Sequence, residues 1–148
     1  MFYVQIGSDP TIWWITQGRA IDSVAQELAQ AASAALPVEF PLAGTLVVSA
    51  RSAGTVWVGP PPPMGSHPSG AVLPGAGIHL PSAVEATPKA PGGYRLLPGT
   101  DLDQLQQNIV AAMNGGTMLT VPVADMGLGA TIVLSGASLA YAVICPQS

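Results

Sequence analysis

The last third of the chain repeats the pattern of an earlier segment. Residues 100–146 follow residues 19–60 at a constant spacing, apart from one insertion of five residues in the later segment. The matched positions are Ile21/Leu102, Asp22/Asp103, Gln26/Gln107, Ala31/Ala112 and Pro41/Pro122 before the insertion, and Thr45/Thr131, Val47/Val133, Ser49/Ser135, Ser52/Ser138 and Pro60/Pro146 after it. We interpret the two segments as a tandem duplication, and this constrains the fold more than any other feature.

Each copy begins with the pattern of two strands, a helix and two further strands. In the first copy, β-formers predict strands over 1–7 and 11–16, and helical spacing of apolar residues predicts a helix over 20–35 that ends at Pro37. A strand over 38–42 should follow, and then a hairpin of 45–49 with 55–58 around 50–54. The second copy predicts a helix capped by Thr100 and stopped by residues 114–116, with strands over 118–123, 130–134 and 139–145.

The predicted fold class is α+β, with mostly antiparallel sheet and two helices, because short antiparallel connections dominate. We expect a single domain, 1–148, in which copies 1–60 and 93–148 are related by a pseudo-two-fold axis, as in a fused dimer. Residues 61–92 form a Pro/Gly-rich connector, whose prolines exclude a central strand. One short strand is expected within it, near 76–80 or near 84–87.

Charged side chains are scarce. They make up 8% of the chain against 49% apolar residues, and the net charge is −4, whereas about a quarter of a soluble globular protein is charged. Much of the surface must therefore be uncharged, and large apolar patches tend to mark interfaces. We expect part of it to be covered by further copies of the chain or by another protein. Nucleic acid is excluded as a partner, because four Lys and Arg residues cannot neutralise a run of phosphates.

A membrane anchor is not expected. The start of the chain lacks the basic region of a signal peptide. Residues 126–148 carry no charge and are long enough to span a bilayer, but turn-forming residues interrupt them and the matching segment carries Arg51. A pair of strands explains both segments, so we expect a cytoplasmic protein or one held within an assembled particle.

No group of residues predicts catalysis, a cofactor or a metal. Asp101 and Asp103 lie at a helix start, where carboxylates stabilise the helix dipole. His67 and His79 have no Cys, His or carboxylate at ligand spacing. Cys145, the only cysteine, is expected to be a small core residue.

The two copies differ in bulky residues, and this difference supplies the interface candidates. Trp13 matches Tyr94, which predicts a common inward face, whereas Trp14 matches Arg95, which predicts an outward or interface position. A tryptophan there can anchor an interface, although it could instead fill a core gap in the first copy alone. The interface candidates are Trp14, Arg95, Trp57 and Tyr3.

These observations favour a non-enzymatic protein that assembles with itself or binds a partner, such as a subunit of a shell, filament, virion or accessory complex. The alternative is a small-molecule-binding or catalytic domain with its pocket between the copies. A third hypothesis is an adaptor that presents the proline run 60–63 to an aromatic groove.

Overall fold

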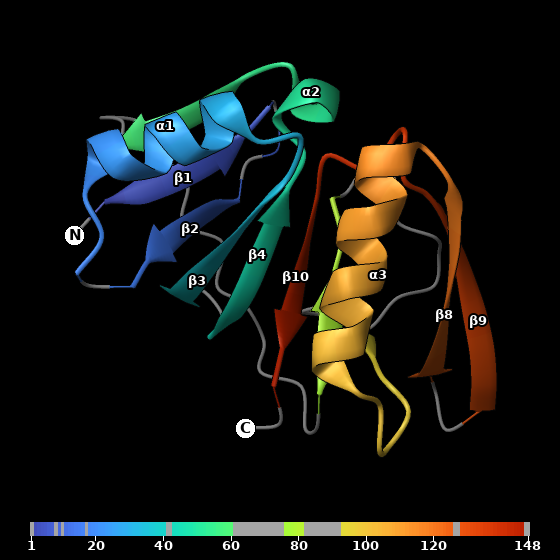
Figure 1. The fold of residues 1–148 in the computed structure, drawn as a ribbon. Coiled ribbons are helices and arrows are strands. Elements are labelled where there is room, and N and C mark those ends of the chain that lie inside the picture. Colours follow the sequence, from blue (N-terminus) through green and yellow to red (C-terminus); the bar gives the residue numbers. More distant parts are fainter. Residues whose placement is uncertain are drawn as a thin grey trace.

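The computed structural model describes residues 2–7, 9, 11–16, 18–40, 43–60, 76–81, 93–125 and 128–146. It confirms an α+β fold with mostly antiparallel sheet and few helices (Figure 1). The elements in chain order are β1 (Tyr3–Ile6), β2 (Ile12–Ile15), α1 (Ile21–Gln30), β3 (Ala34–Phe40), β4 (Gly44–Val48), α2 (Ala50–Ala53), β5 (Val56–Gly59), β6 (Gly77–His79), β7 (Tyr94–Arg95), α3 (Leu102–Gly115), β8 (Met118–Asp125), β9 (Leu128–Ser135) and β10 (Tyr141–Cys145).

The first half of the chain forms five antiparallel strands in the order β5-β1-β2-β3-β4. β1 and β2 form a hairpin, and α1 connects it to a second hairpin of β3 and β4. After the short helix α2, the chain returns to the far side of the first hairpin, where β5 pairs with β1. The last strand of this half is therefore adjacent to its first strand.

The second half has the order β10-β6-β7, followed by the hairpin of β8 and β9. This hairpin meets β7 through a single bridge between Leu96 and Val123. As in the first half, the helix joins a strand pair to a hairpin, and the last strand, β10, pairs with the first, β6. β6 confirms the strand expected near 76–80, while residues 84–87 and most of the connector lie outside the described residues.

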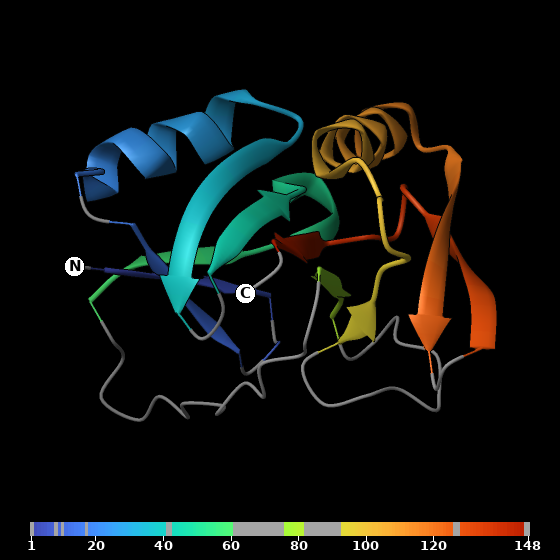
Figure 2. The same cartoon turned by 90° about the horizontal axis from the view of Figure 1, so that it is seen from below.

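The two halves join edge to edge through β4 and β10, which pair antiparallel over four positions from Tyr141↔Val48 to Ile144↔Thr45. The Ser49 N–H donates to the Ala140 carbonyl at 2.8 Å beside this pairing. Viewed from two directions, α1 and α3 lie on either side of β3 and β4 (Figures 1 and 2). β4 and β10 are thus the wall shared by the two halves.

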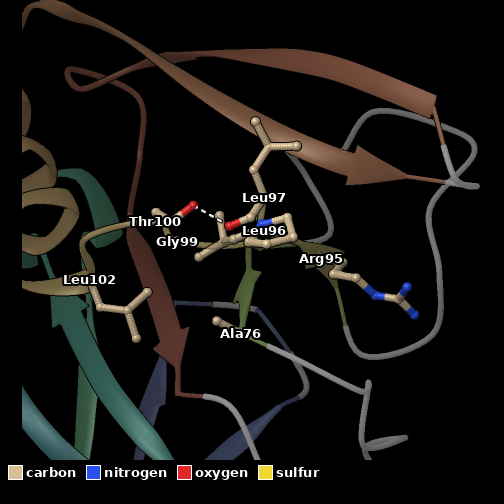
Figure 3. A pocket seen from close by; sticks show the side chains of 8 residues that line it. Ala76, Arg95, Leu96, Leu97, Gly99, Thr100 and Leu102 are labelled. Carbon is tan, nitrogen blue, oxygen red and sulfur yellow. Dashed lines mark hydrogen bonds between the residues drawn. The ribbon is translucent and has the colours of Figure 1, made fainter.

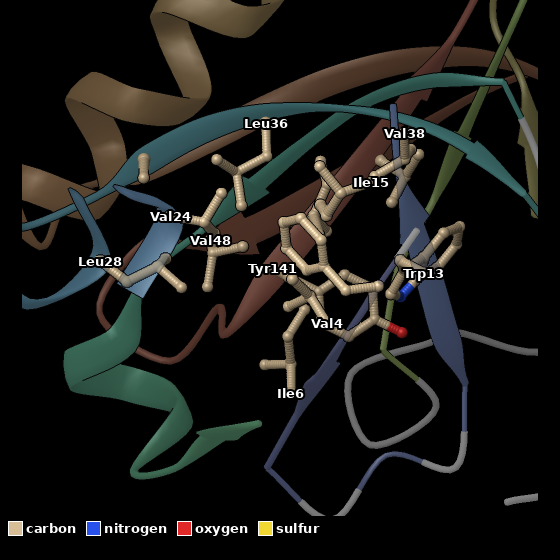
Figure 4. Close-up of a cluster of buried hydrophobic side chains, with 14 residues drawn as sticks. Val4, Ile6, Trp13, Ile15, Val24, Leu28, Leu36, Val38, Val48 and Tyr141 are labelled. Atoms are coloured by element: carbon tan, nitrogen blue, oxygen red, sulfur yellow. The ribbon is translucent and has the colours of Figure 1, made fainter. Parts of the chain in front are cut away.

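Each half has its own hydrophobic core, and the shared wall contributes to both. Because side chains alternate along a strand, Leu46 and Val48 of β4 face the first core with α1, whereas Val47 faces the second core with α3. Figure 4 shows Val48 in the first core beside Val24 of α1. β10 does the same: Tyr141 enters the first core and Ala142 the second. These strands are buried on both faces, which explains their unbroken apolar runs.

The predicted first helix was too long. α1 ends at Gln30, four residues before β3 begins at Ala34, and Pro37 lies within β3 rather than ending the helix. The alternate residues Ala34, Leu36 and Val38 are buried in the first core, so strand burial decides the structure of this segment. Three small residues before the strand carry too little apolar surface to hold another helical turn.

Two other local predictions were wrong. β4 and β5 do not form a hairpin, because β4 pairs with β3 and β10 while β5 crosses to β1. The cap of α3 is Asp101, not Thr100: its carboxylate accepts the Gln104 N–H at 3.1 Å. The helix stop was correct, since α3 ends at Gly115 and Gly116 adopts a left-handed conformation with φ of 65°.

Candidate functional site

The most distinctive surfaces are two outer strand edges: β5 at one end of the eight-stranded sheet, and β9 in the two-stranded sheet of β8 and β9. Among the described strands, β5 pairs only with β1 and β9 pairs only with β8. The two strands lie at opposite ends of the molecule (Figures 1 and 2). An edge strand presents a row of backbone donors and acceptors that can pair with another chain. Both edges are therefore candidate assembly surfaces.

The β8–β9 hairpin exposes apolar side chains on its outer face. Met118 is 63% exposed and Val133 is 60% exposed, and these are the two most exposed of the large hydrophobic side chains that the structure describes. On the other face, Val121, Val123 and Leu134 are buried in the second core. β9 thus carries the consecutive residues Ile132, Val133 and Leu134 without a polar residue among them.

The β5 edge combines an exposed aromatic residue with an apolar groove. Trp57 is 48% exposed, and its indole N–H donates to the Pro60 carbonyl at 3.1 Å. Beside β5, between this strand and α1, lies a groove of about 230 Å³. Its lining is Ala25, Leu28, Ala29, Ala50, Gly54, Val56 and Val58. All of these residues are apolar or glycine, so the groove suits a hydrophobic side chain.

The interface candidates from the sequence fall into different environments. Trp57 and Arg95 are exposed. Trp14 is partly buried and packs on Tyr3 with ring centroids 3.8 Å apart, and Tyr3 itself is buried. The inward face expected for Trp13 agrees with the structure, in which it is fully buried. Of the aromatic candidates, Trp57 is therefore the one that solvent reaches most freely.

A second groove, of about 360 Å³, lies at the start of α3 (Figure 3). It is lined by Ala76, Arg95, Leu96, Leu97, Pro98, Gly99, Thr100 and Leu102. Thr100 donates its hydroxyl proton to the Leu97 carbonyl at 2.6 Å, and the Arg95 side chain extends away from Thr100. The lining holds no carboxylate, imidazole or thiol, so it offers no general acid–base pair for catalysis.

A polar cluster that the sequence did not indicate ties the β1–β2 turn to the shared wall. The buried Tyr141 donates its hydroxyl proton to Asp9 Oδ2 at 3.0 Å, and the Thr11 N–H donates to Asp9 Oδ1 at 2.9 Å. His79 stacks on the Tyr141 ring with an interplanar angle of 18°. Asp9 looked like an ordinary turn residue, because its partner is 132 positions away. The carboxylate here accepts hydrogen bonds from both halves, which is a structural role.

The described residues offer no chemistry of the metal or thiolate kind. No group of three His, Cys, Asp or Glu residues among them could hold a metal ion. Burial raises the pKa of the Cys145 thiol to about 11, so it stays protonated at neutral pH and is a poor nucleophile. His67 lies outside the described residues. No helix in the described part of the chain is both long and apolar enough to cross a membrane.

A scan against protein-family models gave no match, and comparisons with curated proteins and with solved structures gave none either.

Proposed function

We propose that the protein is a non-enzymatic subunit that assembles with copies of itself. The observation that carries this proposal is the exposure of Val133 and Trp57 on two outer sheet edges at opposite ends of the molecule. Only 8% of the residues are charged, and edge strands are normally protected by charges, proline or a covering segment. An uncharged edge with exposed apolar side chains favours strand pairing between molecules.

We also infer that the two halves are a tandem duplication. The strand orders β5-β1-β2-β3-β4 and β10-β6-β7-β8-β9 correspond element by element. The hydrogen bond from the Ile15 N–H to the Phe2 carbonyl, 3.1 Å long, corresponds to the one from Leu96 to Ala76, 2.9 Å long. Pro37 faces Thr45 in the first half, and Pro122 faces Thr131 in the second.

This strand pairing improves the sequence alignment. It matches Pro122 with Pro37 rather than with Pro41, and it places most of the insertion in the helix, since α3 has 14 residues and α1 has 10. The offset between matched positions is 81 residues at Ile21/Leu102, 85 at Pro37/Pro122 and 86 at Thr45/Thr131. The second copy has thus gained one helical turn. We call residues matched in this way counterparts.

The duplication inferred here is head to tail. A two-fold axis would bring the same edge of each half to the junction, whereas β4 is the last strand in the order of the first half and β10 is the first strand in the order of the second. Unlike edges of the two halves therefore meet at the junction, which does not fit the pseudo-two-fold axis expected from the sequence.

Light scattering after size exclusion tests self-assembly. We expect a mass above that of one chain at micromolar concentration, rising with concentration. The association should persist in 1 M salt, because apolar contacts, unlike surface ion pairs, are not screened. A single-chain mass at every concentration would refute the proposal.

A further inference from the structure

We propose that β9 of one molecule pairs with β5 of the next, in the register by which β4 pairs with β10 inside the chain. This inference rests on the proposed self-assembly and specifies its geometry. β9 is the counterpart of β4, and β5 is the counterpart of β10. The chain therefore carries one such junction internally, and no described strand pairs with the two halves of a second junction at its ends.

The internal junction gives the register of the proposed one. The pairs between β4 and β10 are Thr45↔Ile144, Leu46↔Val143, Val47↔Ala142 and Val48↔Tyr141. Replacing each residue by its counterpart gives Thr131↔Val58, Ile132↔Trp57, Val133↔Val56 and Leu134↔Thr55. The β9 side contributes three consecutive apolar residues, like Leu46, Val47 and Val48 in β4. Such a run is typical of a strand buried on both faces, yet Val133 on the outer face of β9 is 60% exposed.

Val133 and the groove beside β5 fit together as a side chain and its recess. Inside the chain, Val47 has 0% exposure and packs in the second core with Ile109, Ala142 and Ile144. The counterparts of those three partners are Leu28, Val56 and Val58, and all three line the 230 Å³ groove. The counterpart of Val47 is Val133, which is 60% exposed. The groove of one molecule is thus the recess for Val133 of another.

Trp57, on the other face of β5, supports the same proposed partner. Its counterpart is Val143, which is fully buried in the first core. In the proposed junction, Trp57 faces Ile132 of the neighbouring molecule, at the rim of the second core. A tryptophan that changes from half-exposed to buried on association is a typical interface anchor.

Two features make the junction between molecules weaker than the internal one. Arg51 donates to the Met113 carbonyl at 3.1 Å across the internal junction, but its counterpart is Ala137. A Cβ at Gly44 would lie 2.3 Å from the Ile144 carbonyl oxygen, and the counterpart of Gly44 is Ala130. Pairing should therefore be limited to Thr131–Leu134.

The proposed junction joins unlike edges, so a molecule that binds through its β5 edge still presents its own β9 edge to the next molecule. Repeated addition then gives a filament, or a ring if the last β9 edge meets the first β5 edge.

Disulfide trapping in a Cys145→Ser background tests the register. Directly opposed residues of antiparallel strands have Cα atoms about 4.5–5.5 Å apart, within the range of a disulfide. We expect Val133→Cys mixed with Val56→Cys to give a cross-linked pair under mild oxidation, and either variant alone to give none. The chain carrying both substitutions should give a ladder of multimers. A mixture of Thr131→Cys and Val58→Cys should cross-link in the same way, because these residues are also directly opposed. A mixture of Thr131→Cys and Val56→Cys is out of register by two residues and should cross-link poorly.

The outcomes separate this inference from the proposed function. Cross-linking of Val133→Cys with itself would overturn the head-to-tail geometry in favour of like edges. Association by light scattering without any cross-link would overturn the β9–β5 junction and leave self-assembly standing. A single-chain mass together with no cross-link would overturn both.

Discussion

Val47 and Val133 are counterparts in the proposed duplication, each in the second strand of an antiparallel hairpin, but one is buried completely and the other is 60% exposed. The difference does not come from the hairpins, which share their strand pairing and a central apolar run. It comes from the elements next to them: β4 pairs with β10, and its Val47 is buried in the second core with α3, whereas no described element pairs with the outer edge of β9. An inner wall and an outer edge can thus be built from one pattern.

The largest effect is expected from placing a charge at each of the two valines. Val47→Lys buries an unpaired ammonium in the second core and should lower the free energy of unfolding by more than about 4 kcal/mol. Val133→Lys should change it by less than about 0.5 kcal/mol in a dilute, unassociated sample. The same change should abolish association, because lysine protects an edge strand. Urea denaturation and light scattering measure the two effects, and equal destabilisation by both variants would contradict the comparison.

An intermediate effect is expected where the internal junction is tightest. Gly44→Ala places a methyl group 2.3 Å from the Ile144 carbonyl oxygen, so the backbone must shift. We expect a loss of about 1–3 kcal/mol in unfolding free energy. Gly129→Ala, in β9, is the matched control, because a Cβ there meets no atom within 4 Å. Thermal or urea unfolding of the pair checks this, and a neutral Gly44→Ala would show that the junction is looser than described.

A small effect on the folded subunit, with a larger one on association, is expected at Trp57. Trp57→Ala removes a half-exposed side chain and should cost less than about 1 kcal/mol of unfolding free energy. Association should weaken at least about tenfold, which corresponds to about 1.4 kcal/mol. Trp14→Ala is the control: because Trp14 packs on Tyr3, it should destabilise the subunit by about 2 kcal/mol and leave association unchanged. Sedimentation measures the association of both variants and urea denaturation measures their stability. A Trp14→Ala variant that loses association, together with a Trp57→Ala variant that keeps it, would contradict these roles.

The sequence predicted most elements because apolar periodicity and turn residues are local signals. It predicted the start of α1 and of α3 well, and it placed Trp13 on an inward face. It failed where distant partners decide. Residues 31–35 had helical composition, yet burial of Ala34 beside Val48 made residues 34 and 35 the start of β3 and residues 31–33 the approach to it.

The candidate site was harder to predict than the fold. Trp57 could be named from the sequence. The proposed interface role of Val133, however, depends on which strands pair with one another, and pairing between strands far apart in the sequence leaves no local pattern. The crossing of β5 to β1, which creates both the open edge and the groove, contradicted the simpler expectation of a hairpin with β4. Only the three-dimensional order of the strands shows that β5 and β9 are outer strands, and the proposed junction rests on this order.

Mixing two blocked variants tests the central claim most directly. Val133→Lys blocks the β9 edge and leaves β5 intact, whereas Val56→Lys blocks the β5 edge and leaves β9 intact. We predict that each variant alone has the mass of one chain by light scattering, and that an equimolar mixture forms a complex of two chains and no larger species. Two variants that remain single chains when mixed, or that assemble without limit, would contradict a head-to-tail junction between β9 and β5.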